Sequence, residues 1–166
     1  MPTRLWRCLL ILALALATPA LALDRDVLLD QANILLLPRE RAIPPLELVD
    51  QDGQRFDTRS LQGRWHILFF GFTACPDICP TTLADLRSVY PALKKIAPDS
   101  QVVFISADPQ RDDITRLKTY TAFFHPEFKA ETGPHEKLFP LVRNLGLIYS
   151  IAEQGEKDYQ IDHTAS

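Results

Sequence analysis

Two cysteines separated by three residues are the residues of this chain most able to do chemistry. Cys75 and Cys79 belong to the string Cys-Pro-Asp-Ile-Cys-Pro, which lies between an apolar run and an amphipathic segment. The helix dipole and free backbone N–H groups favour a thiolate at a helix N-terminus, so we expect these thiols to ionise more easily than ordinary cysteines. Ionised thiols exchange electrons or hold a soft metal, and the pair predicts either activity.

A metal held by two thiolates needs a further ligand, and the chain offers four histidines: His66, His125, His135 and His163. Residues four apart share a helical face, so both cysteines are expected to point to one side of the helix. His66 lies in an apolar run and is expected to be a sheet residue with a satisfied ring. His125 and His135 are expected on the surface, while the ring of His163 has a neighbouring carboxylate to orient it. These residues alone leave the choice of third ligand open.

Residues 1–22 read as a signal peptide that is cleaved after Ala22, or else as an N-terminal membrane anchor. Arg4 and Arg7 precede an unbroken apolar stretch, and a small-x-small pattern ends the segment. Removing these two arginines changes the net charge from −3 to −5, which argues against nucleic acid as a partner. We therefore expect a periplasmic protein, either free or associated with the inner membrane through this segment.

The rest of the chain predicts one α/β domain preceded by a linker or N-terminal arm over residues 23–42. Apolar runs, periodic spacing and turn residues define the elements. We expect a hairpin over residues 46–56, strands over 65–72, 101–106 and 147–151, and helices over 80–98, 112–124 and 135–145. A loop is expected after residue 124, and a turn around Gly155 after the last strand. The strand over 65–72 is apolar enough to be central and buried on both faces. Alternating strands and helices, with the cysteine pair at a strand-to-helix turn, indicate a thioredoxin-like fold with a mostly parallel sheet.

Three strings of the chain together resemble the Sco/SenC family of copper chaperones. They are GFTACPDICPTTL at 71–83, FISADPQRD at 104–112 and YQIDHT at 159–164, and the similarity extends over residues 43–166. The resemblance implies a thioredoxin-like, copper-binding domain that helps to assemble the copper A centre of cytochrome c oxidase. The partners it implies are the copper-bearing oxidase subunit and a protein that reduces the thiols.

By the same resemblance, Cys75, Cys79 and His163 are the expected ligands of a copper ion, either Cu(I) or Cu(II). Asp77 and Asp108 are expected to lie near the site and to tune it. Each aspartate also has a purely structural explanation, because Asp77 could cap the helix and Asp108 could form a local turn before a proline.

The chain departs from the family pattern after His163. Family members continue with further strands and a C-terminal helix, so we expect the domain over 43–166 to be incomplete at its C-terminus. The expected consequences are an open sheet edge, exposed apolar surface and a His163 that lies on a weakly held tail.

The predicted function is that of an exported copper metallochaperone. A thiol-disulfide oxidoreductase that reduces a partner's cysteines is the alternative, although dedicated enzymes of this fold usually have two residues between their cysteines, not three. A thioredoxin-like peroxidase is a weaker alternative. Zinc fits less well than copper, because a structural zinc site takes four ligands and the sequence supplies three.

Overall fold

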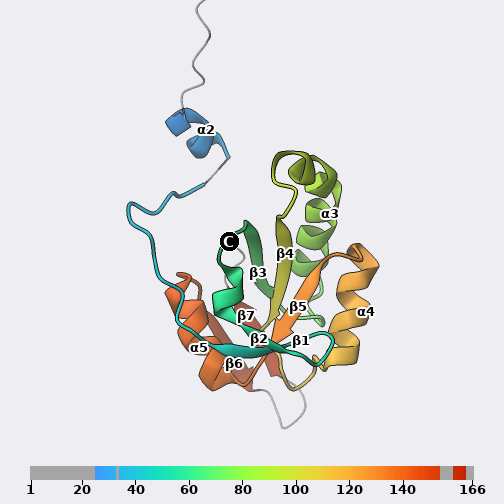
Figure 1. Cartoon of the computed structure of the whole chain (residues 1–166). Coiled ribbons are helices and arrows are strands. Elements are labelled where there is room, and N and C mark those ends of the chain that lie inside the picture. The colour runs from blue at the N-terminus through green and yellow to red at the C-terminus, as the bar shows by residue number, and fades with distance from the viewer. Residues whose placement is uncertain (1–24, 33, 154–158, 164–166) are drawn as a thin grey trace, which may run out of the picture. The chain divides into compact units, whose positions relative to one another are not determined.

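Short apolar segments of the chain assemble into a five-stranded mixed sheet with the strand order β2-β1-β5-β4-β3 (Figure 1). The computed structural model describes residues 25–32, 34–153 and 159–163. The sheet consists of β1 (Glu47–Asp50), β2 (Arg55–Asp57), β3 (His66–Gly71), β4 (Gln101–Ser106) and β5 (Lys129–Thr132). Strands β3, β4 and β5 are parallel, while β1 is antiparallel to β2 and β5. The prediction of a thioredoxin-like arrangement with a parallel centre is confirmed.

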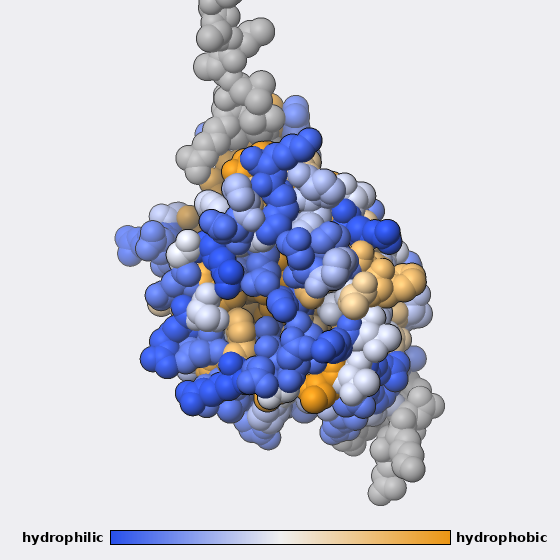
Figure 2. Space-filling model, turned by 45° about the vertical axis from the view of Figure 1, so that its right-hand side comes forward, coloured by the Kyte–Doolittle hydropathy of each residue, from blue (hydrophilic) through white to orange (hydrophobic). Residues whose placement is uncertain are grey.

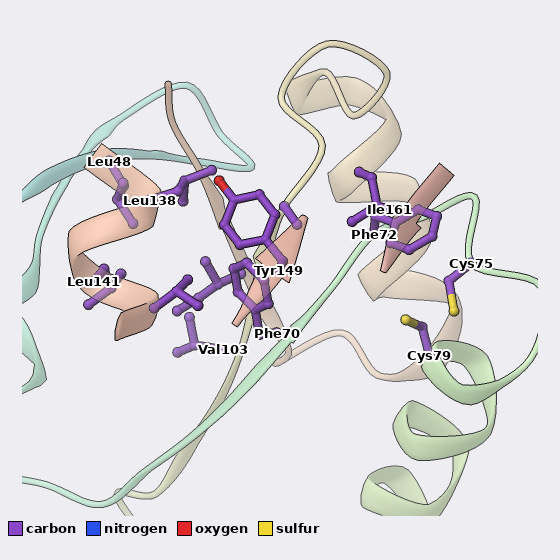
Figure 3. Packing of buried hydrophobic residues seen from close by; sticks show 13 residues of the cluster. Leu48, Phe70, Phe72, Cys75, Cys79, Val103, Leu138, Leu141, Tyr149 and Ile161 are labelled. Atoms are coloured by element: carbon purple, nitrogen blue, oxygen red, sulfur yellow. The ribbon is translucent and has the colours of Figure 1, made fainter. Parts of the chain in front are cut away.

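Helices cover the two faces of the sheet, each over its own hydrophobic cluster. Helices α3 (Ile78–Ile96) and α4 (Ile114–Phe124) pack over one face, where Leu83 and Leu117 are fully buried against Phe104. Helix α5 (His135–Asn144) packs over the other face through residues such as Leu138 (Figure 3). The two cysteines belong to this second cluster, so the packing of the core extends up to the thiols.

A separate antiparallel hairpin, β6 (Tyr149–Glu153) and β7 (Tyr159–His163), packs against the cluster that contains the cysteines. Tyr149 and Ile161 are its buried contacts, and Tyr149 pairs directly with His163 in the strand register. The prediction of a weakly held tail is therefore wrong for His163, because backbone pairing and two buried side chains hold its strand. The predicted turn around Gly155 lies outside the described residues.

Two predicted features of the sheet differ in the structure. β3 is covered on both faces but is an edge strand of the five-stranded sheet, so its expected central position is wrong. The region after α4 was expected to be a loop, yet it contains β5, which the sequence did not reveal because only one of its four residues is apolar. Pairing with two neighbouring strands stabilises this short segment despite its weak local preference.

The chain divides into two compact units, residues 1–40 and 41–166, and each is described by itself. The first contains α2 (Arg25–Gln31), within the region predicted to be a linker or arm, followed by exposed apolar residues at 34–37. Among the described helices, none is both long enough and apolar enough to span a membrane. The predicted signal segment lies outside the described residues.

Hydrophilic residues dominate the face of the molecule seen in Figure 2, and hydrophobic residues appear there only in small separate areas. Large exposed apolar side chains of the second unit include Trp65, just before β3, and Ile96, the last residue of α3. Scattered apolar residues of this kind are normal on a folded domain.

Candidate metal centre

Cys75 lies in a turn between β3 and α3, outside the helix. Its backbone N–H donates to the carbonyl of Phe72 at 3.2 Å, and α3 begins three residues later, at Ile78. The prediction that both cysteines share one helical face is therefore wrong, because only Cys79 is helical. The turn brings the two sulfur atoms close together, as Figure 3 shows.

Cys79 is fully buried in the first turn of α3 and packs directly on the backbone of β3 at Gly71. A Cβ atom added to Gly71 would lie only 2.6 Å from the Cys79 sulfur. The site therefore requires a residue without a side chain at this position. Gly71 was not singled out from the sequence, although a glycine at the end of an apolar strand is a recognised sign of close backbone approach.

Burial raises the pKa of the Cys79 thiol to about 12, and the neighbouring Cys75 thiol and the charge of Asp112 act in the same direction. The expectation of an easily ionised thiol is therefore wrong for Cys79. A helix N-terminus stabilises a charge by about 0.3–1 kcal/mol, whereas full burial can shift a pKa by about 3–5 units. In the metal-free protein Cys79 is a protonated thiol, and a metal that binds it must displace the proton.

His163 ends β7 and presents its ring to the cysteines. Its Nε2 atom lies 3.7 Å from the sulfur of Cys79. The rings of Phe70 and Phe72 make T-shaped contacts with this imidazole, with ring centroids 6.3 and 5.8 Å away. The aromatic contacts and the strand pairing with Tyr149 together restrict where the imidazole can point.

Potential ligand atoms of Cys75, Cys79 and His163 all lie within 4.8 Å of one another. Among the described residues, these three side chains form the one group of three or more cysteine, histidine or acidic residues that is arranged to hold a metal ion. A cavity of about 600 Å³ opens beside it, and Cys75 and His163 line that cavity together with Phe72 and Arg111. The fully buried Cys79 lies behind them, so a ligand in the cavity can reach two of the three side chains from solvent.

The other three histidines lie elsewhere, each in a distinct environment. Both ring nitrogens of His66 are buried without a hydrogen-bond partner, so the expectation of a satisfied ring is wrong, and burial lowers its pKa. His125 accepts a hydrogen bond from the backbone N–H of Glu127 at 3.2 Å. His135 is hydrogen-bonded through Nδ1 to the hydroxyl of Tyr149 at 2.8 Å, and it thereby supports the hairpin that carries His163.

The two aspartates singled out from the sequence have different surroundings. Asp77 is exposed at the mouth of the cavity, and its side chain makes no capping hydrogen bond to α3. Asp108 is buried, pairs with Arg111 and accepts a hydrogen bond from the hydroxyl of Tyr159. Its role is therefore wider than a local turn, because it joins the β4–α4 loop to the first residue of β7. Tyr159 was not singled out from the sequence.

Comparison with known proteins finds similar proteins both by sequence and by structure. A family model described as SCO1/SenC matches residues 37–166. A candidate copper-binding protein of Stutzerimonas stutzeri is 55% identical over 161 residues, which cover 96% of this chain and 79% of that protein. The crystal structure of Arabidopsis thaliana ScoI with copper bound is 38% identical, with a TM-score of 0.67, and the match covers 75% of this chain and 78% of that one.

A further solved structure is that of BsSco, described with a disulfide switch and as a member of the Sco family of cytochrome c oxidase assembly proteins. It is 25% identical to this chain, with a TM-score of 0.57, and the match covers 68% of each chain. The family-model match over residues 37–166 includes the cysteine pair, the five-stranded sheet and His163.

Proposed function

This chain belongs to the SCO1/SenC family, and we propose that it is an exported copper chaperone that delivers copper for assembly of the copper A centre of cytochrome c oxidase. The observation that carries the proposal is the convergence of Cys75, Cys79 and His163, which three separate segments bring within 4.8 Å. The copper-bound ScoI structure and the BsSco description support the choice of metal and of acceptor. The apolar segment over residues 1–22 supports a periplasmic location, free or anchored to the inner membrane.

The donor atoms fit copper better than the other common metals. Two thiolates and one imidazole suit Cu(I), which is soft and accepts three ligands. A structural zinc site takes four protein ligands, and the described residues place no fourth cysteine, histidine or carboxylate in this group. The buried thiol of Cys79 must lose its proton on binding, so copper uptake releases protons.

The geometry also suggests how the copper cargo leaves. Cys79 is buried behind the metal position, whereas Cys75 and His163 line the open cavity. An incoming ligand of the acceptor can therefore reach copper from the cavity side and replace Cys75 or His163 first. Cys79 would be the last ligand released, because the core packs around it.

Copper stoichiometry of the reduced protein tests this proposal. We expect one Cu(I) per chain, and loss of tight binding in both the Cys75→Ser and the Cys79→Ser variants. His163→Ala removes a ligand and should weaken binding by at least the roughly 10- to 100-fold that follows from replacing a residue that only orients a ligand. The matched control His125→Ala, outside the site, should leave binding unchanged. Binding at full strength by Cys75→Ser would exclude the two-thiolate site.

Thiol-disulfide exchange is the second candidate function, because both cysteines are free thiols and lie side by side. In this reaction the two thiols form one disulfide and release two electrons and two protons, which reduce a disulfide of the partner protein to two thiols. A separate thiol reductant would then restore the pair before copper loading. Rapid reduction of a model protein disulfide by the metal-free protein, lost in Cys75→Ser, would favour this function over copper delivery.

A further inference from the structure

Asp112 is a fully buried carboxylate next to the turn that carries Cys75. One carboxylate oxygen accepts hydrogen bonds from the backbone N–H of Thr73 at 2.9 Å and from the hydroxyl of Ser106 at 2.5 Å. The other accepts from the Thr73 hydroxyl at 2.5 Å. A buried carboxylate is costly to desolvate, and these three hydrogen bonds together compensate for that cost.

Each hydroxyl group in the hydrogen-bond network around Asp112 donates to one partner and accepts from another. The Thr73 hydroxyl donates to Asp112 and accepts from the guanidinium of Arg116 at 2.6 Å. The Ser106 hydroxyl donates to Asp112 and accepts from the backbone N–H of Asp108 at 3.1 Å. Because each hydroxyl already uses its one proton, Asp112 must accept at both oxygens for the network to be complete.

This network acts on the cysteine turn through its first residues. Thr73 is held at both its backbone and its side chain, and it lies two residues before Cys75. The preceding residues are also fixed, because the carbonyl of Gly71 accepts from the backbone N–H of Ala107 at 2.7 Å and the carbonyl of Phe72 accepts from Cys75 itself. The start of the cysteine turn is therefore anchored both to the residue that follows β4 and to the buried carboxylate before α4.

From this geometry we infer that Asp112 is a positioning residue for the metal centre: its carboxylate holds the Thr73–Cys75 turn so that the Cys75 sulfur faces Cys79 and His163. The inference rests on the proposed copper site and names a residue that supports it without touching the metal. The two cysteines lie on separate elements, so their spacing depends on the turn. Asp112 links this turn to the start of α4, and the Arg116 guanidinium adds a second link through the Thr73 hydroxyl.

The test compares Asp112→Asn with Asp113→Asn, the same chemical change one residue later. Asparagine at position 112 places an N–H₂ group against hydrogen-bond donors of Thr73 or Ser106 and breaks the network. Asp113 is exposed and caps α4 by accepting from the backbone N–H of Arg116 at 2.8 Å, a role that asparagine also performs. Thr73→Val removes one hydroxyl from the network, and Thr73→Ser retains it.

Two readouts are measured at a temperature where every variant is folded: the Cu(I) dissociation constant, and the equilibrium constant for forming the Cys75–Cys79 disulfide in a glutathione buffer. Asp112→Asn should weaken copper binding by about 10- to 100-fold, the range seen when residues that orient metal ligands are replaced. It should also lower the disulfide constant by about tenfold, because the two thiols meet less often. Asp113→Asn should change neither value, and a residue that only stabilises the fold would lower the melting temperature without moving either readout.

Each outcome decides the inference. Wild-type copper affinity and a wild-type disulfide constant in Asp112→Asn would overturn it. If that variant does not fold, the threonine pair decides: a loss of about fivefold in Thr73→Val with retention in Thr73→Ser supports the role of the network, and unchanged values in both refute it. If the unmodified protein does not bind copper, the proposed function fails, and the disulfide constant still tests whether Asp112 positions Cys75.

Discussion

Replacing Gly71 by alanine should weaken copper binding more than it weakens the fold. The added Cβ atom would lie 2.6 Å from the Cys79 sulfur and 3.1 Å from a ring carbon of Phe104, whereas ordinary contacts begin at 3.4 Å. The sulfur must therefore retreat by about 0.8 Å, the difference between 3.4 and 2.6 Å. Metal–ligand distances tolerate only about 0.2 Å, so this displacement is large for a metal ligand.

The expected magnitude follows from the burial of Cys79. Because the thiol is fully buried, a displaced sulfur overpacks the core around it, and overpacking of this kind costs about 1–3 kcal/mol of folding stability. A displaced ligand should reduce copper affinity by about 10- to 100-fold. Cu(I) affinity is measured by competition with a chromophoric chelator, and stability by denaturant unfolding of the metal-free protein.

Gly133→Ala is the matched control for overpacking away from the sulfur atoms. A Cβ atom at Gly133 would lie 2.8 Å from a terminal carbon of Leu48, the far end of a flexible side chain, and would not meet a cysteine. This variant should lose stability but retain copper affinity. If Gly71→Ala binds copper as tightly as the unmodified protein, the close approach does not position Cys79, and our account of the glycine is wrong.

Three further predictions concern groups around the site and in the core. Copper affinity should rise with pH from about 6 to 9, because burial holds the pKa of Cys79 at about 12 and copper binding must displace the thiol proton. A copper affinity that does not change with pH in competition titrations would refute this. Glu131 is buried with an unpaired carboxylate oxygen, and burial raises its pKa from 4.5 to about 8. The folded protein therefore favours the protonated side chain, which stabilises the fold at low pH. This stability is lost as the pH rises through about 8. Glu131→Gln should therefore be more stable than the unmodified protein at pH 9, by about 1 kcal/mol or more, and equal to it near pH 4; thermal unfolding with no such pH dependence would contradict the assignment. Tyr149→Phe removes the hydroxyl that bonds His135 and should lower the free energy of unfolding by about 1 kcal/mol, and an unchanged denaturation midpoint would show that this bond does not stabilise the hairpin.

The sequence alone was enough to predict the architecture around the cysteines. Three- and four-residue spacing of Leu83, Leu86, Tyr90 and Leu93 predicted the helix that became α3, and the Asp52–Gly53 turn predicted the β1–β2 hairpin. These are local signals, because they depend on which faces of a helix or strand are apolar and on which residues permit a tight turn. The cysteine pair and the three family strings were likewise readable, since they are properties of short segments.

Only the tertiary structure decided how these parts form a site. β5 has no apolar run, and it is a strand because β1 and β4 pair with it. The closeness of Cys79 and His163, which are 84 residues apart, depends on the packing of the β6–β7 hairpin against the core. Sequence spacing contains no information about that distance.

The ionisation of Cys79 and the roles of Gly71 and Asp112 were also beyond the sequence, for one physical reason. Each depends on what surrounds a buried atom on all sides: the core that desolvates the thiol, the backbone against which the sulfur packs, and the three donors that meet one carboxylate. Local sequence determines which groups are available. Burial and long-range contacts determine their charge, their partners and their distance from one another.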